Sequence, residues 1–448
     1  MRDLTQGNIP KHLISFAVPT ILGNMFQLTY NAADSIIVGR FISENALAAV
    51  GTANPIMNIV IFFIAGICLG TSVLMSEFYG KKDMVSFKHE VSTSMVIGAA
   101  FTIISSLLCI IFARPLLHLL NTPDEILSDA TAYLQIIFSG LIFTFFYNIY
   151  SASLRSVGDS KTPIIFLILS SILNVSLDLI FIGIFDFGIR WAACSTVIAE
   201  AVSAILCVIY VYRKIPILKL KPKDIIVKKH LLKITVEYSW ASAMQQTCLH
   251  IGKVLVQGAV NPLGVQSIAA FNAVNRVDDF AFTPQQSIAA SMTTFIAQNR
   301  GAGNKERIKK GFRMGMIMEY AYSVCLGIIV LIIARPVLRL FLPDANSSAL
   351  PLGVVYLTYM AFFYLLPAST NGIQGYFRGM GRMKVTLNST FVQMLFRVIF
   401  AYIFAPRLGF SGIAFACLFG WIAMLTYEVP ILLKSYKTLS SEVNIKGN

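Results

Sequence analysis

The chain has 448 residues, of which 56% are hydrophobic and only 13% are charged, and its formal net charge is +14. A soluble domain carries about 25% charged residues, so this composition excludes an ordinary soluble protein. The positive charge alone would also suit a nucleic-acid-binding protein, which makes the distribution of the basic residues along the chain decisive.

Twelve apolar segments follow one another, and each is long enough to cross about 30 Å of hydrocarbon as a helix. The first segment is too long for a signal peptide and lacks a convincing cleavage site. We therefore expect an all-α integral membrane protein without a soluble domain. The predicted spans are 13–38, 53–76, 91–112, 131–153, 163–184 and 190–211, followed by 235–258, 267–295, 312–333, 351–375, 385–405 and 411–433.

The loops of this predicted topology are alternately rich and poor in Lys and Arg. With the N-terminus in the cytoplasm, the cytoplasmic segments hold 27 of the 36 basic residues, the outer loops hold six, and three are intramembrane. This is the positive-inside distribution, so we expect both termini in the cytoplasm and no nucleic acid as a partner. The stretch 213–233 carries eight Lys or Arg. We interpret it as the loop between two bundles, with contact to anionic lipid as an alternative.

Sequence strings recur at an offset near 221 residues: ARPLLHLL at 113–120 matches ARPVLRLF at 334–341, and LRSVGDSK at 154–161 matches FRGMGRMK at 377–384. Repeats of six helices, an even number, are related by an axis along the membrane normal, and substrate paths in such proteins lie between the halves. We expect two pseudo-symmetric six-helix bundles around a central cavity. The predicted domains are 1–211 (N-terminal lobe), 212–234 (cytoplasmic inter-lobe loop) and 235–448 (C-terminal lobe with a short cytoplasmic tail).

The first span carries a stripe of polar residues. Gln27, Tyr30 and Asn31 precede Asp34 by seven, four and three residues, which places all four on roughly one face of a helix. An ionisable group at the centre of a bilayer costs at least a few kcal/mol. Asp34 therefore requires either a structural or a functional explanation.

A second stripe lies on the fifth span, where Ser171 and Asn174 precede Asp178. Asp34, Asp178 and Thr196 of the sixth span all lie ~9 to 12 Å inside the outer ends of their helices, so they can share one layer. Carboxylate, amide and hydroxyl oxygens suit an alkali cation, and neighbouring carboxylates favour protonation of one of them. The stripes predict a coupling site for Na+ or H+, and the alternative is that both Asp residues only hydrogen-bond other helices.

The second half has charged residues near or within its spans but no comparable stripe. We interpret Lys253 as the partner of Asp278 or Asp279 in a structural ion pair, and Glu200 in the first half is a reserve candidate for cation or proton contact. Pro19 is a candidate hinge, with a static bend as the alternative. The charged residues near or within the spans of the second half are Lys253, Arg276, Asp278, Asp279, Glu319 and Arg397. The weak candidates for the substrate cavity are Gln27, Asn31, Gln245 and Gln246.

The seven Cys and five His form no CxxC, HxxxH or HxH pattern. They indicate neither a disulfide framework nor a metal centre, so we expect no cofactor and no metal beyond Na+ at the coupling site. An intramembrane enzyme such as an acyltransferase or protease would need a His, Ser or metal constellation, which the sequence does not provide.

The whole pattern resembles the multidrug and toxic compound extrusion (MATE) family, and specifically its DinF-like branch. The resemblance covers nearly the whole chain and rests on the duplicated loops, on YNAADSIIVGR followed by LAAVG, on LRSVGDSKTP, and on QNRGAG after the eighth span. The seventh span has Gln245 and Gln246 where the NorM-like branch has a Glu, which argues against a second-lobe cation site of that kind. The resemblance implies an N-terminal-lobe site for Na+ or H+ formed by Asp34, Tyr30, Asn174, Asp178, Thr196, the Ala192 carbonyl and Tyr133, with Pro19 on the first helix.

These features predict a cation-coupled antiporter in a bacterial cell membrane that exports small organic, cationic amphipathic compounds by alternating access. Membrane lipids surround it, and nothing in the sequence requires more than a monomer. The alternative is a lipid-linked precursor flippase of the same superfamily. Such flippases commonly have 14 helices and a more basic cavity, so twelve spans and three intramembrane Lys or Arg favour the antiporter.

Overall fold

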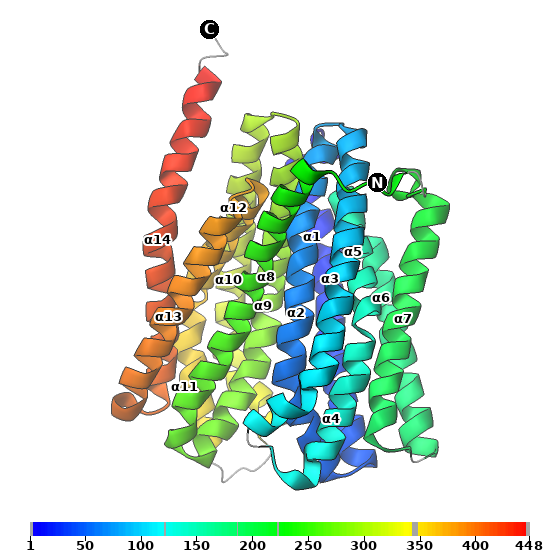
Figure 1. Cartoon of the computed structure of the whole chain (residues 1–448). Helices are drawn as coiled ribbons and strands as arrows, with labels where there is room; N and C mark the ends of the chain where they lie inside the picture. Colours follow the sequence, from blue (N-terminus) through cyan, green and yellow to red (C-terminus); the bar gives the residue numbers. More distant parts are fainter. Residues whose placement is uncertain (1–2, 121, 186, 222–223, 343–347, 445–448) are drawn as a thin grey trace. The chain divides into compact units, whose positions relative to one another are not determined.

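A computed structural model describes residues 3–120, 122–185, 187–221, 224–342 and 348–444, excluding the side chains of 31–36, 38–40, 44, 47 and 440–444. Its described residues form helices joined by short turns, with no strand among them (Figure 1). Each of the twelve predicted spans coincides with a helix or a pair of helices in this part of the chain.

The chain divides into two compact units. Unit 1 contains residues 1–3 and 22–247, and unit 2 contains residues 4–21 and 248–448. The boundaries fall inside α1 (Ile9–Phe41) and α8 (Lys229–Val260), so each of these continuous helices begins in one unit and ends in the other. The predicted lobes follow the sequence repeat and stay a prediction, whereas the units follow contacts between residues.

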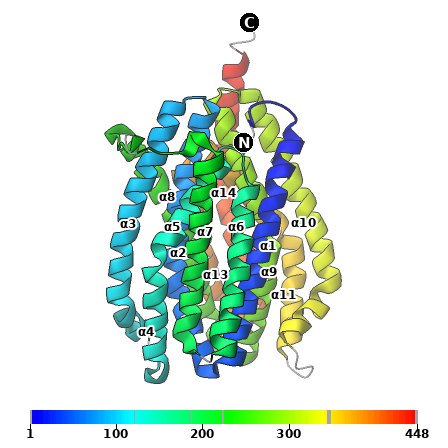
Figure 2. The same cartoon turned by 90° about the vertical axis from the view of Figure 1, so that its right-hand side faces the viewer.

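Unit 1 is built from long helices around an apolar core that includes Phe138, Phe145 and Leu154. Its helices α6 and α7 lie side by side (Figure 2). Besides its parts of α1 and α8, the unit contains α2 (Glu44–Gly80), α3 (Met84–Leu119), α4 (Asp124–Ser139), α5 (Leu141–Ser156), α6 (Lys161–Asp178), the π-helix η1 (Leu179–Ile184), α7 (Gly188–Lys214) and the short η2 (Pro216–Leu218).

Unit 2 is likewise built from long helices around an apolar core. Its α13 and α14 lie side by side (Figure 1). A second apolar core packs the start of α1 against α9, α10 and α12, through residues such as Leu13, Phe295 and Phe377. The unit contains η4 (Asn261–Leu263), α9 (Val265–Gly301), α10 (Lys305–Phe341), α11 (Ala349–Phe363), α12 (Leu365–Gly379), α13 (Met383–Leu408) and α14 (Ser411–Asn444).

By length and composition, seven helices of the described chain can cross a membrane, and nine can if each bent pair counts as one span. The bent pairs are α4 with α5, at 44°, and α11 with α12, at 50°. They correspond to the predicted spans 131–153 and 351–375, which are therefore bent helices. α1, α8 and α9 coincide with the remaining three predicted spans and have 33, 32 and 37 residues, but they are not among the described helices that are apolar enough to cross by this measure.

The backbone confirms the internal repeat. Asp83 caps α3 by accepting a hydrogen bond from the Ser86 N–H at 3.0 Å, and Asn304 caps α10 in the same way from the Arg307 N–H at 3.2 Å. The residue before each cap, Lys82 or Gly303, has a positive φ of 62° or 70°. The Ser86 N–H also holds the pKa of the Asp83 carboxyl below its usual value.

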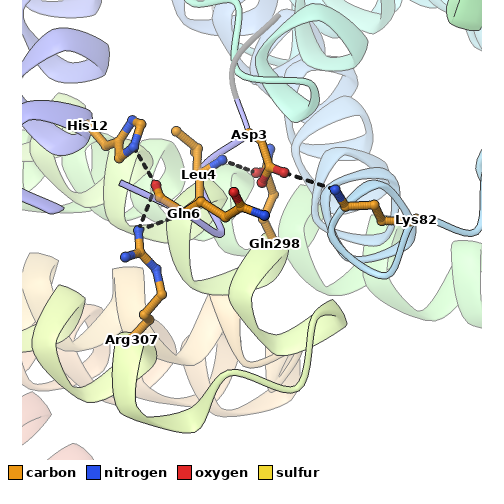
Figure 3. A network of polar contacts seen from close by, with 7 residues as sticks. All are labelled: Asp3, Leu4, Gln6, His12, Lys82, Gln298 and Arg307. Carbon is orange, nitrogen blue, oxygen red and sulfur yellow. Dashed lines mark hydrogen bonds and ion pairs between the residues drawn. The ribbon is translucent and has the colours of Figure 1, made fainter. Parts of the chain in front are cut away.

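The residues before α1 are bound in unit 2 by the end of α9 and the start of α10 (Figure 3). The Leu4 N–H donates to Gln298 Oε1 at 3.0 Å, and Arg307 donates to the carbonyls of Leu4, Gln6 and Gly7 at 2.8 to 3.1 Å. These are charge-assisted bonds to backbone oxygens. In unit 1, Lys82 pairs with Asp3 at 3.1 Å. The QNRGAG string therefore has a structural role at the start of the chain.

Two glycines allow α2 to pack closely on the first part of α8. A Cβ added to Gly66 would lie 2.6 Å from Ala243 Cα, and one added to Gly70 would lie 2.5 Å from the Tyr238 carbonyl oxygen. These close neighbours are backbone atoms, which cannot move aside as a flexible side chain can. The pair forms a small-xxx-small motif of the kind that brings membrane helices together.

We predict that Gly70→Ala destabilises unit 1 by about 1–3 kcal/mol, the usual cost of overpacking a close contact. Thermal unfolding of the purified protein in detergent measures the loss. Gly51→Ala on the same helix is the matched control, because no atom lies within 4 Å of its added Cβ. Equal midpoints for the two variants would contradict the packing interpretation.

Candidate functional site

Three helical segments of unit 1 bring together the polar residues of the second predicted stripe. Asn174 and Asp178 lie one turn apart at the end of α6 and are 1% and 0% exposed. Thr196 lies in the first half of α7, which packs against α6, and Tyr30 lies in the part of α1 that belongs to unit 1. Buried polar side chains in an apolar protein require partners, and these residues provide them for one another.

The local backbone changes where the site lies. α6 ends at Asp178, and the next six residues, Leu179–Ile184, continue as the π-helix η1. π-helical turns are rare and occur frequently at functional sites. Here the change of helical pitch begins directly after the buried carboxylate.

The Asn174 amide connects α1, α6 and α7. In the orientation that satisfies both of its ends, its nitrogen donates to Tyr30 Oη at 3.0 Å and to Asp178 Oδ2 at 3.2 Å. Its oxygen accepts from the Thr196 backbone N–H at 3.0 Å. Asn174 thus joins three other predicted site residues, Tyr30, Asp178 and Thr196.

Ser195, which the sequence analysis did not select, is a further member of this group. Its hydroxyl donates to Asp178 Oδ1 and also lies 2.9 Å from the Ala192 carbonyl oxygen, as an alternative acceptor. The Thr196 hydroxyl donates to the same carbonyl at 3.1 Å. A signal was present in the sequence, because Ser195 follows Ala192 by three residues and so lies on nearly the same helical face.

The arrangement provides hard oxygen atoms of several kinds around one carboxylate. Asp178 supplies the charge, the Ala192 carbonyl and the hydroxyls of Ser195 and Thr196 supply neutral oxygens, and the Asn174 amide nitrogen donates to the carboxylate. Such ligands suit a hard cation, and the carboxylate can alternatively bind a proton. No group of three or more His, Cys, Asp or Glu that could hold a metal ion occurs among the described residues.

The remaining predicted residues have different positions. The side chains of Asp34 and Asn31 lie outside the described residues, although their backbone is part of α1. Tyr133 is buried on α4, which packs against α7, and Pro19 lies inside α1. Among the weaker candidates, Gln27 is exposed, Gln245 is buried and Gln246 is partly buried.

Other predicted charges have partners elsewhere. Lys253 pairs with Asp279 at 3.1 Å, which confirms the expected ion pair and selects between its two candidate partners. Asp278 instead accepts a hydrogen bond from Tyr364 at 2.9 Å. In unit 1, Glu200 accepts from the Thr144 hydroxyl of α5.

The family model described as MatE matches residues 19–180 and 241–403 of this chain. The probable multidrug resistance protein YpnP of Bacillus subtilis is 29% identical over 414 residues, covering 92% of each chain. The probable multidrug resistance protein NorM of Thermotoga maritima is 26% identical over 437 residues, covering 93% of this chain and 89% of the relative.

Among solved structures, a crystal structure of MATE in complex with MaL6 superimposes with a TM-score of 0.92 at 21% identity, covering 98% of this chain and 99% of the other. This likeness confirms the predicted all-α membrane fold. The two segments that the family model matches also agree with the internal repeat, one in each half of the sequence.

We predict that Asn174→Ala lowers the free energy of unfolding by about 1–3 kcal/mol, because it removes hydrogen bonds of a buried amide to groups on three helices. Thermal unfolding in detergent measures the effect. Ser176→Ala is the control on the same helix, since the Ser176 side chain is exposed and its hydroxyl bonds only within the helix, to the Ile172 carbonyl. A midpoint for Asn174→Ala equal to that of Ser176→Ala would show that the amide does not connect the helices.

Proposed function

Because the chain belongs to the MatE family, whose model matches most of its length, we propose that it is a cation-coupled antiporter that exports organic, cationic amphipathic compounds. It is a multi-pass membrane transporter and not an enzyme. The proposal adds three points: Na+ or H+ drives export, the coupling ion binds at the Asp178 site, and the two lobes give alternating access to the substrate.

The observation that carries the proposal is the buried carboxylate of Asp178 surrounded by neutral oxygens. A carboxylate held in this way is stabilised by its hydrogen-bond donors, and carboxylate oxygens bind Na+ or H+. Asp34, one turn beyond Tyr30 on α1, is the second proposed carboxylate of the site.

Coupling requires that the ion and the substrate prefer different states of the transporter, by a few kcal/mol. The Asn174 amide offers a route, because it donates both to Asp178 and to Tyr30 of α1. An ion that binds the Asp178 oxygens competes with the Asn174 amide for them. The hydrogen bond from Asn174 to Tyr30 then changes, and with it the position of α1, which carries Tyr30.

The substrate class is supported by the relatives, both of which are called probable multidrug resistance proteins. The bacterial relatives also support a location in the cell membrane. We propose that both termini face the cytoplasm, as the distribution of Lys and Arg indicates, and that a monomer is the working unit.

We predict that Asp178→Asn abolishes ion-driven substrate export, because the neutral side chain can be stabilised without a coupling ion, and that Asp34→Asn does the same. The measurement is efflux of a fluorescent cationic dye from proteoliposomes under separately imposed Na+ and pH gradients. Asp124→Asn is the control, since Asp124 is exposed at the start of α4.

Full ion-driven export by Asp34→Asn and Asp178→Asn would show that the coupling site is wrongly placed. Headgroup translocation of a lipid-linked precursor without dye export, measured in the same vesicles, would favour the flippase instead. The gradient that drives export in the unmodified protein identifies the ion.

Pro19 supports a hinge in α1. It lies two residues before the boundary between Ile21 and Leu22, at which α1 passes from unit 2 to unit 1. A proline inside a helix removes one backbone hydrogen bond and lowers the cost of bending there. We propose that α1 bends at this point when the coupling ion binds.

Pro19→Ala restores the missing hydrogen bond, so we expect a stiffer α1 and at least tenfold slower export with the protein still folded. The measurement is the same proteoliposome assay, together with size-exclusion chromatography. Pro55→Ala is the matched control, because Pro55 also lies inside a helix, α2, but entirely within unit 1. Similar export by both variants would contradict the hinge.

A further inference from the structure

Unit 2 contains three charged residues on helices α10, α12 and α14, which pack against one another. Glu319 lies on α10, Arg378 at the end of α12 and Glu428 in the middle of α14. Both glutamate side chains are 0% exposed. The Arg378 guanidinium attracts both carboxylates electrostatically. With all three ionised, the cluster would carry one uncompensated negative charge.

The two glutamates are poorly supplied with hydrogen-bond donors. All four carboxylate oxygens of Glu319 and Glu428 are shielded from solvent and have no partner at hydrogen-bond distance among the described residues, and the same holds for Arg378 Nε, although Ser389 and Gln374 lie close enough to stabilise the Glu428 carboxylate. Buried polar groups are otherwise satisfied in native proteins, so four such oxygens in one cluster are an exception that needs an explanation. This differs from the Asp178 site, where donors contact the carboxylate directly.

The groups that face the cluster come from every helix packed around it. On α10, Tyr322 lies near Glu319 but donates its hydroxyl to the Ala281 carbonyl of α9, at 3.0 Å. On α12 and α13, Gln374 and Ser389 stabilise the Glu428 carboxylate. Gln374 also donates to Thr390 Oγ1 at 3.0 Å. Arg378 is thus the cation that faces both carboxylates.

An ionised carboxylate without hydrogen bonds in a buried position is strongly unfavourable, and one guanidinium can offset one of the two. Protonation of the other glutamate removes the remaining charge. We propose that Glu319 and Glu428 form a proton-binding site in unit 2, in which one of the two carries a proton in the conformation described here.

A proton fits this cluster better than a metal cation. A hard cation is coordinated by about six oxygen atoms, whereas the neighbouring hydroxyls of Tyr322 and Thr390 are engaged with other partners. A proton needs only one carboxylate oxygen. The proposal does not rest on the function proposed above, because proton binding can be measured on a protein that transports nothing.

Infrared difference spectroscopy of the whole protein in lipid nanodiscs tests the site, because a protonated buried carboxyl has a C=O stretch that an ionised carboxylate lacks. We expect this band at neutral pH in the unmodified protein. Either Glu319→Gln or Glu428→Gln should weaken it, and the double variant should lose all of the intensity that this cluster contributes, while other buried carboxyl groups such as Glu90 and Asp278 keep theirs. Gln has nearly the shape of a protonated Glu, so we expect these variants to fold.

Two controls define the site. Glu306→Gln removes a glutamate from the first turn of the same helix, where its side chain is 54% exposed, and should leave the band unchanged. Asp178→Asn removes the proposed coupling carboxylate of unit 1 and should also leave it. Loss of the band in Asp178→Asn alone would assign the proton to unit 1 and overturn the proposal.

A second measurement keeps the test independent of the spectrum. Titration of the purified protein from alkaline to neutral pH should show that the double variant takes up one proton fewer than the unmodified protein. Equal proton uptake, absence of the band in the unmodified protein, or a band of unchanged intensity in the double variant would each overturn the proposal. Displacement of the band by Na+ at constant pH would identify a cation site instead.

Discussion

The structure depends on the cost of leaving a polar group unpaired in an apolar environment. This cost confines the described backbone to helices, whose hydrogen bonds are internal. It also limits where polar side chains can lie along those helices. Asn174 satisfies it by making hydrogen bonds to three helical segments at once. The same constraint therefore determines both the fold and the position of the candidate site.

The two buried acidic sites meet this constraint differently. Asp178 accepts hydrogen bonds directly from Ser195 and Asn174. The Glu319 and Glu428 oxygens have no partner at hydrogen-bond distance among the described residues, and the guanidinium of Arg378 faces both carboxylates. The repeated fold thus contains different chemistry in its two units.

The sequence predicted the helices well because apolar length is a property of each segment alone. It also predicted Asn174, Asp178 and Thr196 as neighbours, because their spacing places them on single faces at similar depth. It could not select Glu428, since this residue has no polar stripe on its own helix and its significance comes only from α10 and α12. The compact units were not foreseen either, because they depend on contacts that hydropathy does not encode.

The helix α1 belongs to both units. Residues 4–21 belong to unit 2, where Arg307 binds three backbone carbonyls just before the helix starts. The same helix continues into unit 1 and carries Tyr30, a partner of Asn174. Pro19 lies between these two attachments, and a proline inside a helix lowers the cost of bending there. The proposed hinge therefore lies between the part of α1 that Arg307 holds and the part that carries Tyr30.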